Sequence, residues 1–417
     1  MKQKSNYNKF LLLWSGELVS SIGGGLTSFG LGVYVFNQTK SAGSMALVSL
    51  LAFLPTLLLS APAGVLADRH DRRALMMIGD GLSALGLLYI LICMYSGGAK
   101  LYQICIGVCV SSIFSSLLEP AYRSTVTDLL TAEEFSKASG MVSLAGSARY
   151  LISPVLAGLL LSVSDIKVLL IIDIMTFFLT VFCTAVVKKG LESKQEAPKQ
   201  SFMESFKEGW QAIREKKGVL MLVLVAAVMT CFMGSIQILS EPMVLNFASS
   251  TVLGVCETVC ACGMLVSSLI LGIFGIKKHY VSVLSSSLVL AGLAMVGFGL
   301  KENIVLISVF GFVFFFMIPF ANNSLDYLVR TNIDAAKQGR VWGLIGLISQ
   351  SGYVVAYAFG GVLSDKIAVA RGIGVGRGSA TVIMISGGLL VVVALLLNCL
   401  EPVRKLEKCD GKEIISE

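Results

Sequence analysis

The segment Gly64-Val-Leu-Ala-Asp68-Arg69-His70-Asp71-Arg72-Arg73 is a short charged interruption between two long apolar stretches, residues 42–63 and 75–95. Each stretch is about as long as the roughly 20 residues that a helix needs to cross a lipid bilayer. A charged turn between two such stretches is typical of a polytopic membrane protein. The rest of the chain can be interpreted outward from this segment, as apolar spans joined by charged connections.

The composition excludes an ordinary soluble enzyme and a disordered protein. Hydrophobic residues make up 55% of the 417 residues and charged residues only 14%, whereas a soluble domain carries about 25% charged residues. The apolar pattern predicts an all-α polytopic membrane protein with twelve transmembrane helices, at residues 10–36, 42–63, 75–95, 101–121, 138–162, 167–187, 218–246, 252–276, 280–300, 303–325, 341–364 and 379–399.

Polar segments divide the chain into two six-helix bundles. We expect an N-terminal bundle over residues 1–187, a cytoplasmic linker over 188–217, a C-terminal bundle over 218–400 and a cytoplasmic tail over 401–417. In the second part of the linker, apolar residues recur at helical spacing, which predicts an amphipathic helix on the membrane surface: Phe202, Phe206, Trp210 and Ile213. The first part of the linker is equally consistent with a solvated connection.

The distribution of Lys and Arg sets the orientation. Of the 33 basic residues, 25 fall in segments on the side of the N-terminus, 7 fall in the opposite loops, and Arg149 lies inside a span. Basic residues concentrate in cytoplasmic loops, so both termini are expected in the cytoplasm of a multi-pass protein of the cell membrane. The net charge of +7 reflects these loops and does not indicate nucleic-acid binding.

No cofactor, metal site or catalytic set is expected. Most of the ten cysteines lie in apolar stretches, and Cys256, Cys260 and Cys262 lack the further ligands of a zinc site. A phosphate-binding loop of the Gly-x-x-x-x-Gly-Lys-Ser/Thr type is also absent from the sequence. The sequence therefore favours a protein driven by an ion gradient over an ATP-driven pump or an enzyme.

A short match between the two halves suggests internal duplication. The residues Gly64-Val-Leu-Ala-Asp68-Arg69 are echoed by Gly361-Val-Leu-Ser-Asp365-Lys366, and in the expected topology the two copies lie on opposite sides of the membrane. Such an arrangement fits inverted repeats.

The charged segment resembles the cytoplasmic signature of the major facilitator superfamily, which has a Gly, then Asp-Arg, then a basic pair. The phrases Leu13-Trp14-Ser15-Gly16-Glu17 and Ile152-Ser153-Pro154-Val155-Leu156-Ala157-Gly158 are similar to the branch that contains macrolide-efflux proteins and the enterobactin exporter. The resemblance implies two six-helix bundles with inverted repeats that export compounds in exchange for protons by alternating access.

The resemblance also implies roles for two sets of residues. Ion pairs around the signature that form in one conformation and break in the other would make a cytoplasmic gating latch. In this latch Asp68 would cap a helix or accept hydrogen bonds from the nearby arginines. The residues of the latch are Gly64, Asp68, Arg69, Arg72 and Arg73. The span with Pro154 and Gly158 is similar to the antiporter helix of the superfamily, although Ser153 and Ala157 replace glycines and Arg149 stands where a small residue is usual. This helix could equally serve close packing alone, and the arginines could act only as topology determinants.

Charged residues at membrane depth mark the candidate internal site. Arg149 lies near the middle of its span, and either Glu17 or Asp173 could pair with it if the helices are neighbours. These three residues are the candidates for ion coupling or for the substrate cavity, with a purely structural ion pair as the alternative. Asp80 is expected to pair with Arg72 or Arg73.

The leading hypothesis is a proton-coupled antiporter for small amphipathic compounds, of the antibiotic-resistance type, acting as a monomer. Apolar residues on the first, fourth, seventh and tenth spans would suit such a substrate: Phe29, Tyr34, Phe114, Met229, Phe232, Met233, Phe310, Phe314, Phe315 and Phe316. The alternatives are a lysolipid or lipid translocator of the same fold and a non-transporting membrane sensor or partner.

Overall fold

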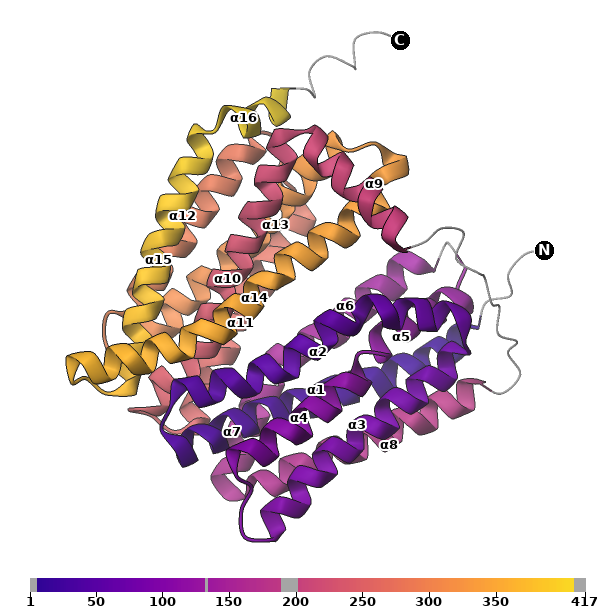
Figure 1. Ribbon diagram of the computed structural model, residues 1–417, viewed down its shortest axis with the longest axis vertical. Helices are drawn as coiled ribbons and strands as arrows, with labels where there is room; N and C mark the ends of the chain where they lie inside the picture. Colours follow the sequence, from indigo (N-terminus) through magenta and orange to yellow (C-terminus); the bar gives the residue numbers. More distant parts are fainter. Residues whose placement is uncertain (1–5, 132–133, 189–201, 409–417) are drawn as a thin grey trace. The chain divides into compact units, whose positions relative to one another are not determined.

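The computed structural model describes residues 6–131, 134–188 and 202–408, and all the regular structure in these ranges is helical (Figure 1). The helices are α1 Tyr7–Thr39, α2 Ala42–Arg69, α3 Arg72–Tyr95, α4 Leu101–Ser115, α5 Leu118–Leu129, α6 Phe135–Leu151, α7 Ser153–Val163, α8 Ile166–Lys188, α9 Phe202–Glu215, α10 Lys217–Leu245, α11 Ser250–Phe274, α12 Tyr280–Gly299, α13 Ile304–Asn332, α14 Ala335–Arg371, α15 Val375–Cys399 and α16 Glu401–Lys408.

Twelve segments among the described residues are long and apolar enough to cross a membrane, which confirms the predicted fold class. Two of these segments are interrupted by a proline near the middle. Pro120 follows the break between α4 and α5, and Pro154 follows the break at Ile152 between α6 and α7. Proline lacks the N–H that continues a helical ladder and clashes with the preceding turn, so each span divides into two helices there.

The chain separates into two compact units. The first contains the described parts of Met1–Lys40, Leu47–Lys199 and Ser249–Thr258. Within it α1 packs on α6, α7 and α8, while α3 packs on α4, α5 and α8. A buried cluster near the beginning of α1 ties these helices together, with Phe10, Met76, Leu129 and Val187 among its members.

The second unit contains Ser41–Ala46, the described part of Gln200–Ala248, and the described part of Val259–Glu417. Here α12 packs on α13 and α15, and α10 packs on α14 and α15. The short helices α9 and α16 lie against α14 and α10, respectively. The first turn of α2 therefore belongs to a different unit from the rest of that helix.

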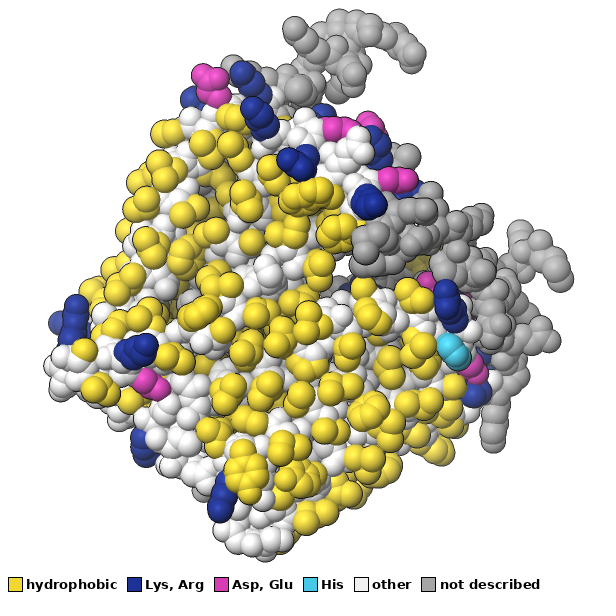
Figure 2. All heavy atoms as spheres, in the orientation of Figure 1, with side chains coloured by type: hydrophobic (Ala, Val, Ile, Leu, Met, Phe, Trp, Pro, Cys, Tyr) yellow, Lys and Arg dark blue, Asp and Glu magenta, His cyan; other side chains and the backbone are white. Residues whose placement is uncertain are grey.

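The outer surface of the helices is apolar. Figure 2 shows hydrophobic side chains along the helices on the visible face, with Lys and Arg mainly near helix ends. Large apolar side chains such as Phe182, Leu269 and Phe359 are strongly exposed. Exposure on this scale is unfavourable in water and favourable in lipid, as expected for membrane-spanning helices.

The charged segment of residues 64–73 is mostly helical, which corrects the expectation of a loop. Residues 64–69 continue α2, and only His70 and Asp71 separate α2 from α3. The short turn is possible because Asp71 caps α3, and its side chain accepts a hydrogen bond from the backbone N–H of Arg73 at 3.1 Å. The capping role considered for Asp68 therefore belongs to Asp71.

Candidate functional site

Three acidic side chains lie inside the membrane-spanning part of the first unit. They are Glu17 on α1, Asp80 on α3 and Asp173 on α8, and the last two are each only 1% exposed. Glu17 interacts electrostatically with Asp80, and Asp80 with Asp173. Three neighbouring helices thus place their carboxyl groups within range of one another, although these groups are not clustered tightly enough to form a metal site.

Asp80 is held by a hydroxyl group. The Thr180 Oγ1 of α8 donates a hydrogen bond of 2.6 Å to Asp80 Oδ2. The expected pair with Arg72 or Arg73 is wrong for Arg72, whose guanidinium is instead 2.8 Å from Asp128 Oδ1. Asp80 lies too far into α3 for that contact and faces α8, so the sequence separation along one helix was a poor guide to its partner.

A glycine on α1 makes room for Asp173. A Cβ atom at Gly23 would lie 2.9 Å from Asp173 Oδ1 and 2.6 Å from Thr176 Oγ1, closer than real Cβ contacts. Thr176 in turn donates to the backbone carbonyl of Asp173 at 2.7 Å. Only a residue without a side chain allows α1 to approach the carboxyl group this closely.

Arg149 lies on α6 with an exposed side chain. Its positive charge acts on the carboxyl groups of both Glu17 and Asp173. Within the described residues, however, no contact as close as an ion pair joins Arg149 to either carboxylate. The sequence suggested a pair if the helices were neighbours; α1 does pack on α6, but the direct pair is not formed.

The helix break before Pro154 is a packing site for α11. The Thr258 Oγ1 donates to the backbone carbonyl of Leu151 at 2.9 Å, and the Thr251 Oγ1 donates to that of Gly158 at 3.0 Å. A Cβ at Gly158 would meet the Ser250 carbonyl oxygen at 2.7 Å. These contacts belong to the first unit, and they show that Pro154 and Gly158 lie in a closely packed region.

The residues of the expected gating latch are anchored within the first unit. Arg72 is 2.8 Å from Asp128 and 4.0 Å from Asp68. Arg73 is buried, whereas Arg69 is exposed. A Cβ at Gly64 would meet no atom within 4 Å, so local crowding does not explain the glycine.

Asp71 beside this latch has a lowered pKa. Burial alone would raise the pKa of Asp71, but the hydrogen bond from Lys188, the N–H of Arg73 and the positive charges of both residues outweigh burial. The Lys188 Nζ is 3.1 Å from Asp71 Oδ2, which ties the end of α8 to the start of α3.

The segment Gly361–Lys366, which repeats the pattern of the charged segment, contains Asp365, a residue that was not among the charged candidates from the sequence. Asp365 on α14 accepts hydrogen bonds from the backbone N–H groups of Ala42 and Gly43, at 3.0 and 2.9 Å, and from the Ser41 hydroxyl at 2.6 Å. All four residues belong to the second unit. Asp365 therefore caps the first turn of α2 from a distant part of the chain.

Three residues expected along a substrate path have buried side chains: Phe29, Met229 and Phe314. These side chains contribute to packing.

Comparisons with known proteins cover nearly the whole chain. A family model described as Major Facilitator Superfamily matches residues 13–357. Macrolide efflux protein A of Streptococcus pyogenes is 24% identical over 417 residues, which cover 98% of this chain and 100% of that protein. An uncharacterized MFS-type transporter of Bacillus subtilis strain 168, YfiS, is 28% identical over 410 residues, covering 94% and 93% of the two chains.

Solved structures share the fold. A bacterial homologue of the human lysosomal transporter Spinster, in an inward-facing and unoccupied conformation, has a TM-score of 0.74 at 15% identity, covering 98% of this chain and 99% of that chain. The POT family transporter PepTSo has a TM-score of 0.77 at 11% identity, covering 97% and 99%. At such low sequence identity, these structural similarities show only that the fold is shared.

Proposed function

Because the chain belongs to the Major Facilitator Superfamily, a family of membrane transporters, we propose that it exports small amphipathic compounds, such as macrolide-like drugs or siderophores, in exchange for protons. The observation that carries the proposal is the set of membrane-embedded charges in the first unit, Glu17, Asp80, Asp173 and Arg149. The names of relatives that align over their full length supply the direction and the substrate class.

The environment of the carboxyl groups supports a role in proton coupling. Carboxyl groups at membrane depth are costly and typical of proton relays in transporters. Asp80 and Asp173 are each 1% exposed, and threonine hydroxyls donate hydrogen bonds to their side chains. A hydroxyl can donate to a carboxylate or accept from a protonated carboxyl, so each site accommodates both protonation states.

Arg149 supplies the competing positive charge. Its positive charge acts on both Glu17 and Asp173. A proton taken up by one carboxyl removes a negative charge on which Arg149 acts, which changes the balance of charge across three helices. We assign this change of charge to the coupling step.

The membrane potential provides enough energy for such export. One charge that moves through 100 mV yields about 2.3 kcal/mol. Because each 1.4 kcal/mol corresponds to a factor of ten, one proton sustains roughly a fortyfold concentration gradient of substrate. No nucleotide is required for this cycle.

We also assign orientation and gating on the same basis. The excess of Lys and Arg in alternate connections supports a topology with both termini in the cytoplasm. The turn between α2 and α3 would then lie on the cytoplasmic side. A gating latch there would consist of Gly64, Asp68, Arg69, Arg72 and Arg73.

Growth of a pump-deficient bacterial host tests the proposal. The host expresses the protein and is challenged with a panel that includes erythromycin. We expect a higher inhibitory concentration for some compounds, abolished by a protonophore and by Asp173→Asn. The matched control is Asp165→Asn, an exposed aspartate paired with Lys167 at 3.1 Å, which should leave resistance unchanged.

Two outcomes would contradict the proposal. Resistance that survives the protonophore and Asp173→Asn would remove proton coupling. Uptake of labelled lysolipid into vesicles, with no change in resistance to any compound, would instead support the alternative of a lipid translocator.

A further inference from the structure

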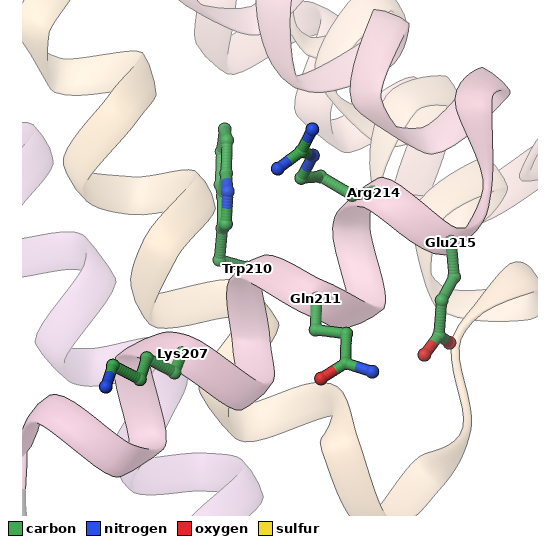
Figure 3. A pocket seen from close by; sticks show the side chains of 5 residues that line it. All are labelled: Lys207, Trp210, Gln211, Arg214 and Glu215. Carbon is green, nitrogen blue, oxygen red and sulfur yellow. The ribbon is translucent and has the colours of Figure 1, made fainter.

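The outward face of α9 carries two cations and an indole side by side. At 100° per residue along a helix, Trp210, Arg214, Lys207 and Gln211 occupy one continuous arc, in that order. Lys207, Gln211 and Arg214 are exposed, and Trp210 is half-buried. Figure 3 shows Trp210 and Arg214 extending from the same side of the helix.

Another side of α9 makes contacts inside the second unit. Gly209, Ala212 and Ile213 are buried, and a Cβ at Gly209 would lie 3.0 Å from the backbone oxygen of Arg340 on α14. This part of the helix therefore packs on protein, whereas Phe206 on the predicted apolar face is exposed. The arc with Trp210 and the two cations is what remains for an external ligand.

Two acidic residues of α9 are already paired. Glu208 forms an ion pair with Arg340, and Glu215 lies 3.7 Å from Lys337. Within the part of the chain that the structure describes, Lys207 and Arg214 form no ion pair. Glu208 and Glu215 are thus neutralised by α14, whereas Lys207 and Arg214 are exposed.

The arc lines a hollow of about 420 Å³, bounded by Lys207, Trp210, Gln211, Arg214 and Glu215. The hollow is shallow and widely open. The Glu215 carboxylate is offset by Lys337. The net chemistry of the hollow is that of an anion site with one aromatic wall.

The position of α9 brings this hollow to a membrane surface. Only Lys216 separates α9 from α10, which is one of the membrane spans. With Lys216 and Lys217, four basic residues lie within residues 207–217. Basic clusters directly beside a membrane span attract anionic lipids, and Trp concentrates at the level of the headgroups.

We propose that this face of α9 binds the headgroup of an anionic phospholipid, such as phosphatidylglycerol, from the adjoining leaflet. Lys207 and Arg214 donate hydrogen bonds to the phosphate oxygens, and the Gln211 amide is available to the headgroup hydroxyls. Trp210 borders the first acyl carbons. A lipid held here bridges α9 and the leaflet beside α10, and this role does not depend on the substrate or the coupling ion.

Titration of the full-length protein with single lipids, read by native mass spectrometry, tests the site. We expect phosphatidylglycerol to bind more tightly than phosphatidylcholine with the same acyl chains. In the K207Q/R214Q variant the Kd for phosphatidylglycerol should rise about fivefold for each cation removed. The charge-preserving variant K207R/R214K should retain the preference.

The control variant K277Q/K278Q removes two exposed basic residues from the segment between α11 and α12. Its Kd for phosphatidylglycerol should stay at the wild-type value. Equal losses in both glutamine variants, or equal affinity for the two lipids in the wild-type protein, would overturn the proposal. Displacement of the lipid by millimolar inorganic phosphate would also overturn it, because the site would then recognise a soluble anion.

Discussion

The ion pair between Arg72 and Asp128 gives a quantitative test of how the charged segment is anchored. The two side chains are 17% and 22% exposed, and the Arg72 Nη1 lies 2.8 Å from Asp128 Oδ1. The same nitrogen is 3.4 Å from the Ser124 backbone carbonyl. Arg72→Gln and Asp128→Asn each remove one partner and leave the other without its charge.

The burial of this pair sets the expected magnitude. A hydrogen bond between charged groups that are largely shielded from solvent contributes about 1.5–3 kcal/mol. We therefore expect either single variant to lose about 2 kcal/mol, which lowers the unfolding midpoint of a unit of this size by roughly 4–8 °C. In the double variant the loss should be less than the sum, by a coupling energy of about 1–2 kcal/mol.

The protein contains a matched control pair on a neighbouring helix. Arg123 and Glu119 on α5 are 2.9 Å apart, but their side chains are 69% and 67% exposed. Solvent screens such a pair, so its coupling energy should be about 0.5 kcal/mol or less. Both cycles can be measured by thermal unfolding in the same detergent, with Arg123→Gln and Glu119→Gln as the control variants.

A coupling energy for Arg72 and Asp128 no larger than that of the exposed pair would refute this reasoning. It would mean that burial does not strengthen the contact. A role of this ion pair in gating would be detected separately. In that case, transport by the variants would fall further than their amount of folded protein.

Three further predictions concern single contacts. Asp365→Ala should speed hydrogen exchange at the amides of Ala42 and Gly43 by about fivefold or more, since a lost helix cap costs about 1 kcal/mol; unchanged rates would show that Asp365 does not cap α2. Gly23→Ala should destabilise the protein by about 1–3 kcal/mol in thermal unfolding, whereas Gly24→Ala, with open space around it, should be tolerated; equal effects would argue against the close approach to Asp173. Thr180→Val should cost about 1–3 kcal/mol because it leaves Asp80 without its donor; the exposed Thr127→Val is the control, and a loss of the same size there would contradict the assignment.

The periodic and compositional features of the fold were predictable from sequence. Spans of about 20 apolar residues can form only helices in a bilayer, so the twelve spans follow from hydrophobicity alone. The break before Pro154 has a local contribution, because proline lacks the N–H that continues the helical ladder, but prolines such as Pro242 and Pro319 lie inside continuous helices. The charged segment of residues 64–73 indicated the family correctly.

The partners of the charged residues were not predictable, because they depend on helix rotation. Asp80 was expected near Arg72 along the same helix, yet it faces Thr180 on α8. Arg149 and Asp173 lie within electrostatic range, but a direct contact needs a side-chain geometry that spacing does not specify. The role of Asp365 required two segments more than 300 residues apart to meet, and only the echo of the Gly-Val-Leu pattern hinted at it.

Proteoliposomes that contain a trapped pH indicator give the most direct test of proton exchange. When an erythromycin gradient is imposed across the bilayer, the account predicts a proton flux opposite to the movement of erythromycin. Asp173→Asn should abolish that flux and Asp165→Asn should preserve it. Erythromycin movement without any change in internal pH, or a proton flux in Asp173→Asn equal to that of the wild-type protein, would contradict the account.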